Sequence, residues 1–189
     1  MTLTLFRRNP LREAAELAYR RIVEQARQPG FFVDLGVPDS VDGRFELIAL
    51  HAFLYLRRLK REQPDSAPLA QRFFDTMFTD FDRSLREMGT GDLSVGREVK
   101  RMARAFYGRA EAYERGLAGN VSALQAALAR NLFGTAPATL PDYLKAMAAY
   151  LRREAEHLDA QPAATLLAGE FRFGAPPALQ FAVKAGGQG

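Results

Sequence analysis

The chain has 189 residues, 26 Lys and Arg against 22 Asp and Glu, 14 Phe, no Cys and no Trp. This length suits a single domain, and a composition with 48% hydrophobic and 25% charged residues is typical of globular proteins, which argues against a disordered chain. The lack of Cys excludes disulfides, thiol catalysis and Cys-ligated metal centres, and two His residues 106 positions apart leave little material for a His-based metal site.

The first half of the chain shows a helical pattern of apolar residues. Asn9 and Pro10 predict the start of a first helix, which Pro29-Gly30 ends. We expect a loop over residues 31–41 and then a second helix over 42–61, with Asp39, Ser40 and Asp42 as candidate caps. The centre of this second helix is apolar on every side, as in a helix that lies at the middle of a fold.

Four more helices are expected over residues 67–88, 95–117, 121–133 and 140–158. The expected N-caps are Ser66 for the first, Asp92 or Ser94 for the second, Asn120 or Ser122 for the third and Thr139 for the fourth. A short helix is possible over 163–169. The sequence therefore predicts an all-α protein: a single domain of five to seven helices packed around the helix at 42–61, with a flexible C-terminal tail.

Within this one domain we distinguish four segments: an N-terminal helix (1–30), a core (31–134), a C-terminal helical appendage (135–174) and a flexible tail (175–189). The net charge alternates along the core. Residues 63–94 carry three positive and six negative side chains, whereas residues 95–118 carry six positive and three negative. Acidic and basic helices that alternate in this way indicate helices that pair with each other.

Candidate catalytic groups are few. Asp75 and Asp82 share a helix face and could bind a metal or act in acid–base chemistry, but Asp82 also stands four residues before Arg86, so ion pairing is the favoured interpretation. His51 lies in the most apolar helix and is expected to be a buried, hydrogen-bonded histidine. We predict no catalytic residue, no metal site, no cofactor and no enzymatic activity.

The helix over 95–117 carries a basic outer face with Arg97, Arg101 and Arg104. These side chains could contact the phosphates of RNA or of lipid headgroups, or could be neutralised by the acidic helix before them. DNA binding is not expected, because no strong net basic footprint is present.

Adjacent Phe pairs are the remaining anomaly, since one face of a helix cannot bury both members equally. Either neighbouring helices take both sides, or an apolar groove is open to a hydrophobic partner. For the second case the predicted groove residues are Phe31, Phe32, Phe73, Met77, Phe78, Phe106 and Tyr107. Arg44, Asp75, Asp82, Arg86 and Asp92 are expected to form a buried or semi-buried polar scaffold.

Several stretches resemble the ubiquinol–cytochrome c chaperone family. They are GVPDSVDGRFELIALH at 36–51 with FLYLRRL at 53–59, FDTMFTDFDRSLREMGTGD at 74–92, VGREVKRM at 95–102 with FYGRAEAY at 106–113, and RNLF at 130–133. Gln25-Ala26-Arg27, Pro29 and Phe31-Phe32 agree as well. The resemblance covers residues 19–133 and is weak from Thr135 onward.

The resemblance implies an assembly chaperone that binds newly made cytochrome b and supports assembly of the cytochrome bc1 complex. A small partner subunit, the ribosome or the membrane surface are further partners that it suggests. No targeting extension, signal peptide or membrane-spanning run is visible, so we expect a bacterial, cytoplasmic protein, peripheral at the inner membrane if bound there. The alternative function is an RNA- or ribosome-associated helical protein that uses the basic face at 95–117.

Overall fold

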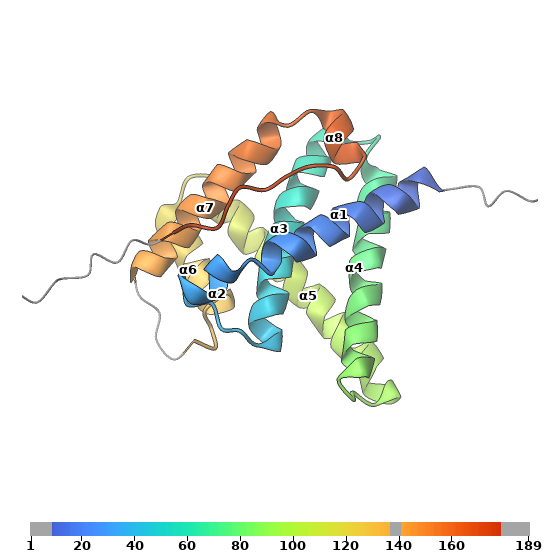
Figure 1. Cartoon of the computed structure of the whole chain (residues 1–189), viewed down its shortest axis with the longest axis horizontal. Helices are drawn as coiled ribbons and strands as arrows, with labels where there is room; N and C mark the ends of the chain where they lie inside the picture. Colours follow the sequence, from blue (N-terminus) through green and yellow to red (C-terminus); the bar gives the residue numbers. More distant parts are fainter. Residues whose placement is uncertain (1–8, 137–140, 179–189) are drawn as a thin grey trace, which may run out of the picture.

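The computed structural model describes residues 9–136 and 141–178, and within these ranges it contains α-helices, one 3-10 turn and no β-strand (Figure 1). The helices are α1 (Pro10–Ala26), α2 (Pro29–Val33), α3 (Val41–Leu59), α4 (Ala67–Glu87), α5 (Asp92–Leu117), α6 (Val121–Asn131), α7 (Pro141–Ala160) and α8 (Ala163–Leu167), with the 3-10 turn η1 at Lys60–Glu62. The all-α prediction is confirmed. The eight α-helices of these ranges exceed the expected five to seven, because α2 forms one turn that overlaps the start of the expected loop and the possible helix α8 is present.

Three helix starts follow the predicted capping chemistry. The side chains of Asn9, Ser40 and Asn120 each accept a hydrogen bond from the backbone N–H three residues ahead, at 3.2, 3.1 and 2.9 Å. Ser66 is the N-cap residue of α4, as predicted, but its hydroxyl donates to the Leu59 carbonyl at 2.6 Å and does not cap the helix. The expected cap of the next helix, Asp92 or Ser94, is wrong. Helix α5 has Gly91 as its N-cap, without a side-chain hydrogen bond. The expected cap Thr139 lies outside the described residues.

Helix α3 is the centre of the fold, as its apolar pattern predicts. It contacts α1, α4, α5 and α7, and most of its residues from Leu47 to Leu59 are buried. Because neighbours cover it on several sides, both faces of α3 and both members of adjacent apolar pairs can enter the core.

An extended segment follows α8, and we call residues 169–178 the strap. In Figure 1 the strap leaves α8 and runs back along α7. The ring of Phe171 is fully buried and stacks on Tyr55 at a centroid distance of 4.4 Å. Farther along, the Gly174 carbonyl accepts a hydrogen bond from Gln25 at 2.8 Å, and the Ala175 carbonyl accepts one from Arg153 at 2.5 Å. The expected flexible tail begins at residue 175, but this contact ties residue 175 to α7; residues 179–189 lie outside the described residues.

Helices α4 and α5 form a hairpin, and its turn projects beyond the rest of the bundle at the bottom of Figure 1. We call the turn and the adjoining ends of the two helices the α4–α5 arm. The turn closes through Gly89, whose φ of 85° lies in the left-handed region that glycine adopts without a side-chain clash.

Candidate functional site

The seven predicted groove residues do not form one surface. Phe31, Phe73 and Met77 are fully buried, and Phe78 and Phe106 are almost so, whereas Phe32 is half-buried and Tyr107 is 61% exposed. For the buried residues, the thick-core interpretation of the Phe surplus holds. Phe73, for example, contacts the rings of Tyr19 and Tyr55 at centroid distances of 6.3 and 5.0 Å.

Its neighbour Phe74 points the other way. The Phe74 ring is half-buried and lies 5.5 Å from the exposed ring of Tyr107 and 5.9 Å from Phe106, centroid to centroid. The adjacent pair Phe73-Phe74 therefore supplies one ring to the core and one to the α4–α5 surface.

Phe31 belongs to a buried cluster around His51. Its ring meets His51 and Tyr150 edge-on at centroid distances of 5.5 and 5.3 Å. His51 Nδ1 donates to the Leu47 carbonyl at 2.7 Å, so Nε2 accepts the Tyr150 hydroxyl proton, also at 2.7 Å, and Gln25 donates to the Tyr150 oxygen at 2.9 Å. Burial lowers the pKa of His51 to about 4, and the imidazole is neutral and structural, as predicted.

A groove of about 770 Å³ lies between the second halves of α3 and α5. We call it the α3–α5 groove. Its apolar lining is formed by Phe53, Leu56, Phe106, Tyr107 and Ala110. Its charged lining is formed by Arg57, Lys60, Arg61, Glu111, Glu114 and Arg115. Two of the seven predicted residues, Phe106 and Tyr107, therefore line an open groove with an apolar floor and a charged rim.

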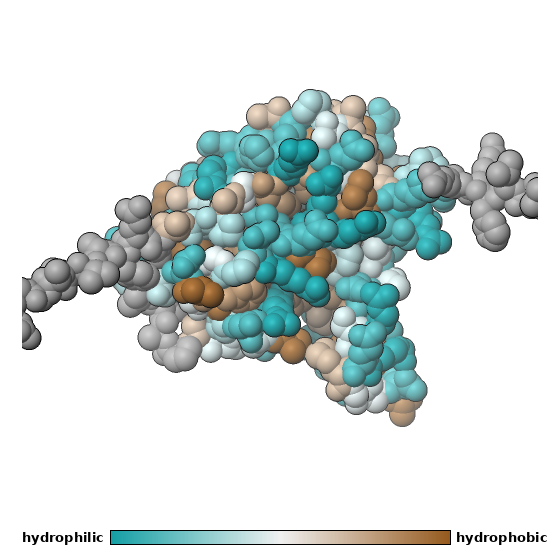
Figure 2. Space-filling model, viewed as in Figure 1, coloured by the Kyte–Doolittle hydropathy of each residue, from teal (hydrophilic) through white to brown (hydrophobic). Residues whose placement is uncertain are grey.

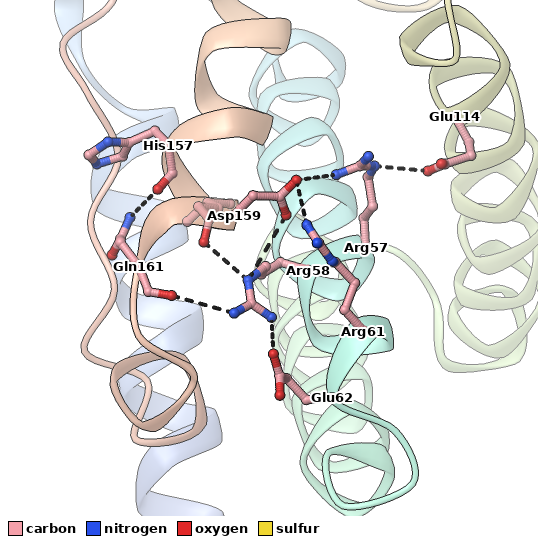
Figure 3. Close-up of polar contacts among 9 residues, drawn as sticks. Arg57, Arg58, Arg61, Glu62, Glu114, His157, Asp159 and Gln161 are labelled. Carbon is pink, nitrogen blue, oxygen red and sulfur yellow. Dashed lines mark hydrogen bonds and ion pairs between the residues drawn. The ribbon is translucent and has the colours of Figure 1, made fainter.

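Ion pairs hold one wall of this groove in place (Figure 3). Arg57 reaches both Glu114 of α5, at 3.2 Å, and Asp159 of α7, at 3.5 Å. Asp159 also pairs with Arg61 at 2.8 Å. Arg58, which is buried beside them, donates to the Leu158 and Gln161 carbonyls and pairs with Glu62. One network thus joins α3, α5 and α7, so the groove exists before any partner binds.

The basic residues proposed for phosphate contact are all exposed on α5. Arg101 pairs with Glu98 at 2.7 Å, and Arg97 donates to the Ser94 hydroxyl at 3.2 Å. The alternative, neutralisation by acidic residues of α4, does not describe these pairs, because Glu98 and Ser94, the partners of Arg101 and Arg97, lie on α5 itself.

The carboxylates of α4 form ion pairs and hydrogen bonds. Asp82 pairs with Arg86 at 2.6 Å, as predicted, Asp75 accepts from Gln71 at 2.8 Å, and Asp80 accepts from the Tyr19 hydroxyl at 2.8 Å. Among the described residues, no group of three or more His, Asp or Glu side chains is placed to hold a metal ion.

The expected polar scaffold is wrong in its burial for four of its five residues. Arg44, Asp75, Arg86 and Asp92 are exposed, and only Asp82 is semi-buried as expected. Their pairs lie at the surface, where water screens them and they contribute little stability. Arg44 binds Asp39, and Arg86 also reaches Asp92 at the α4–α5 turn.

Two buried carboxylates, Glu46 and Glu154, were not singled out from the sequence. Glu46 of α3 forms a bidentate ion pair with Arg109 of α5, and burial raises the pKa of this carboxyl group against the opposing effect of Arg109. Glu154 of α7 is fully buried and accepts from the Gly174 N–H of the strap at 2.7 Å. The only sequence signal for either residue is a carboxylate at an inward-facing helical position, and it does not reveal the partner.

None of the helices within residues 9–136 and 141–178 is long and apolar enough to cross a membrane.

Comparison with known proteins agrees with this architecture. The model of the family described as ubiquinol-cytochrome C chaperone matches residues 33–173. The match begins later than the resemblance at 19–133 and continues past Thr135, where the resemblance is weak, through α7 and into the strap. A crystal structure of the Cbp3 homolog from Brucella abortus is 39% identical, with a TM-score of 0.77 over 92% of this chain and 96% of that one.

Curated relatives are more distant. A Xenopus laevis protein named ubiquinol-cytochrome-c reductase complex assembly factor 1 is 26% identical over 77% of this chain and 72% of its own length. The mouse and human proteins of that name are 27% and 26% identical, and the chain spans 54% and 51% of their lengths. Because the family model matches well over half of the chain, the chain belongs to the ubiquinol–cytochrome c chaperone family.

Proposed function

We propose that this protein is a non-enzymatic assembly chaperone of the cytochrome bc1 complex and that it binds newly made cytochrome b in the α3–α5 groove. The membership in the family, whose curated relatives are named as assembly factors of this complex, is the observation that carries the proposal. The groove supports the part of the proposal that concerns the client.

The chemistry of the groove suits an apolar helix with polar ends. Phe53, Leu56, Phe106 and Ala110 offer an apolar floor on which such a helix can bury its side chains, and Tyr107 adds an exposed aromatic ring at the edge. The charged rim lets the same helix keep its polar flanks hydrated. Because the ion pairs of Figure 3 already fix the wall, little ordering is needed on binding.

The buried residues among the seven predicted groove residues support the proposed contact surface from the core. Phe73 and Met77 fill the core that holds α3 and α4 in place. Tyr107 is 61% exposed and Phe74 is half-buried, whereas Phe106, at 3% exposure, lines the groove from below. The proposed contact surface is therefore narrower than the sequence suggests.

A site-specific crosslink tests this assignment. A photoreactive phenylalanine analogue at Tyr107 should crosslink to newly made cytochrome b in cells, and the same analogue at Val33, which is 79% exposed on α2, should not. Equal crosslinking from both positions, or crosslinking from Tyr107 to ribosomal proteins alone, would contradict the proposal.

A substitution measures how much the Tyr107 ring contributes to the affinity for cytochrome b. Tyr107→Asp should weaken cytochrome b binding roughly 30-fold, the effect of losing an interface anchor worth about 2 kcal/mol. Val121→Asp, at another exposed apolar position, is the matched control and should copurify with cytochrome b as the wild type does.

A further inference from the structure

The first half of α5 carries its basic residues on one side. At 100° per residue, Leu93, Arg97, Lys100, Arg101 and Arg104 fall within a band about 100° wide. All five side chains are exposed, and we call them the α5 stripe. With a rise of about 1.5 Å per residue, the stripe extends roughly 17 Å along the helix.

The stripe ends in apolar side chains at the turn of the α4–α5 arm. Leu93 is 99% exposed, and Met88, on the other side of the turn, is 52% exposed. Figure 2 shows hydrophobic surface at the end of the projecting arm, below an otherwise hydrophilic side. An exposed Leu at the end of a projecting hairpin serves no packing role in the fold.

The charge of the stripe is open to an external partner. Within the described residues, Lys100 and Arg104 have no ion pair, and Arg101 is paired with Glu98, which lies off the stripe. The next acidic residue on this side of the helix is Glu111, two turns beyond Arg104. A shallow depression of about 460 Å³ lies among Arg97, Glu98, Lys100, Arg101 and Arg104.

We propose that the α4–α5 arm binds the surface of an anionic lipid bilayer. Leu93 and Met88 enter the boundary between headgroups and acyl chains, while the Arg and Lys side chains of the stripe contact lipid phosphates. The exposed Leu favours lipid over a nucleic acid, because a bilayer provides an apolar phase beneath its phosphates. The stripe shares no residue with the lining of the α3–α5 groove, so substitutions in the stripe leave the side chains of the proposed client site unchanged.

The lack of Trp in the chain allows a direct test with a single fluorophore. Leu93→Trp should show a blue-shifted emission with phosphatidylglycerol vesicles and quenching by brominated acyl chains. Val33→Trp places the same fluorophore at an exposed position on α2 and should show neither change. Emission from Leu93→Trp that is unchanged by these vesicles would overturn the proposal.

Charge reversal tests the stripe. In vesicle sedimentation, the Lys100→Glu/Arg104→Glu variant should bind phosphatidylglycerol vesicles at least about tenfold more weakly than the wild type. The Arg130→Glu/Lys145→Glu variant has the same net charge and should lose much less. Equal losses in the two variants would show that only net charge matters and would overturn the assignment to the arm.

Two further measurements separate the lipid from other anions. Wild-type binding to phosphatidylglycerol vesicles should exceed binding to phosphatidylcholine vesicles and fall with added salt. Leu93→Ser should reduce vesicle binding roughly tenfold, because it removes the apolar anchor. Tighter binding to single-stranded RNA than to the vesicles, unaffected by Leu93→Ser, would overturn the lipid proposal in favour of RNA.

Discussion

Individual polar side chains join parts of this chain that are far apart in sequence. His51 of α3 is linked through the Tyr150 hydroxyl to Gln25 of α1, and Gln25 binds the Gly174 carbonyl of the strap. Because burial makes an unpaired polar group costly, such a chain of hydrogen bonds fixes how four segments, α1, α3, α7 and the strap, meet.

The buried imidazole predicts a loss of stability in acid. The pKa of His51 is lowered to about 4, while an unfolded His titrates near 6.5. Between about pH 6.5 and about pH 4 the unfolded chain therefore binds a proton that the folded protein does not. This group should lower the free energy of unfolding by up to about 3 kcal/mol across that window and contribute its full stabilisation above it.

Urea unfolding as a function of pH checks this expectation. His51→Gln should be less stable than the wild type at neutral pH but should lose less stability from there to pH 4. His157→Gln, at the exposed histidine of α7, should keep the wild-type pH profile. If His51→Gln retains the wild-type slope, the acid sensitivity comes from other groups.

At the scale of elements, most helices could be predicted because they depend on local signals. Apolar periodicity, Asn9 as a cap and Gly89 as a terminator act within a few residues, so they are visible in the sequence. Ser66 is the N-cap residue of α4 as expected, but its hydroxyl does not cap the helix, because it bonds across the 3-10 turn to Leu59, a contact that depends on how the linker folds.

Two glycines of α5 show how helix contacts set local sequence requirements. A Cβ atom added to Gly116 would lie 2.7 Å from Leu124 Cβ and 2.8 Å from Leu124 Cα in α6. A Cβ added to Gly108 would meet nothing within 4 Å. Gly116 therefore permits the close crossing of α5 and α6, whereas Gly108 only weakens the helix.

Alanine at these two positions should have opposite effects. Gly116→Ala should lower the free energy of unfolding by about 1–3 kcal/mol, because the backbones of α5 and α6 must move apart. Gly108→Ala should raise it by up to about 1 kcal/mol, since Ala has the higher helix propensity. Denaturant unfolding of both variants is the measurement, and an equal effect of the two would contradict the close-crossing argument.

At the scale of the whole molecule, the strap closes the fold. It carries no regular secondary structure, yet Phe171 is fully buried against Tyr55 and 5.5 Å from Phe173, centroid to centroid. Residues near the end of the described chain thereby cover the central helix α3, and the family match reaches the same segment.

Removal of the buried ring should destabilise the whole domain. Phe171→Ala should cost about 3–5 kcal/mol, the usual effect of deleting a fully buried Phe. Arg172→Ala, at the neighbouring exposed residue, should change stability by less than about 0.5 kcal/mol. Thermal and urea unfolding compare the two; a similar small effect for both would mean that the strap is not part of the folded core.

By itself, the sequence determined the helical class, the central position of α3, the cap at Asn9 and, through its motifs, the family. These features depend on local periodicity or on short sequence motifs. The tertiary structure decided which aromatic rings are exposed. Phe73 and Phe74 are adjacent and chemically identical, yet one lies in the core and the other beside Tyr107, because burial depends on which helix covers each face. For the same reason, the α3–α5 groove, the Glu46–Arg109 pair and the strap are properties of packing between distant segments, which no local pattern encodes.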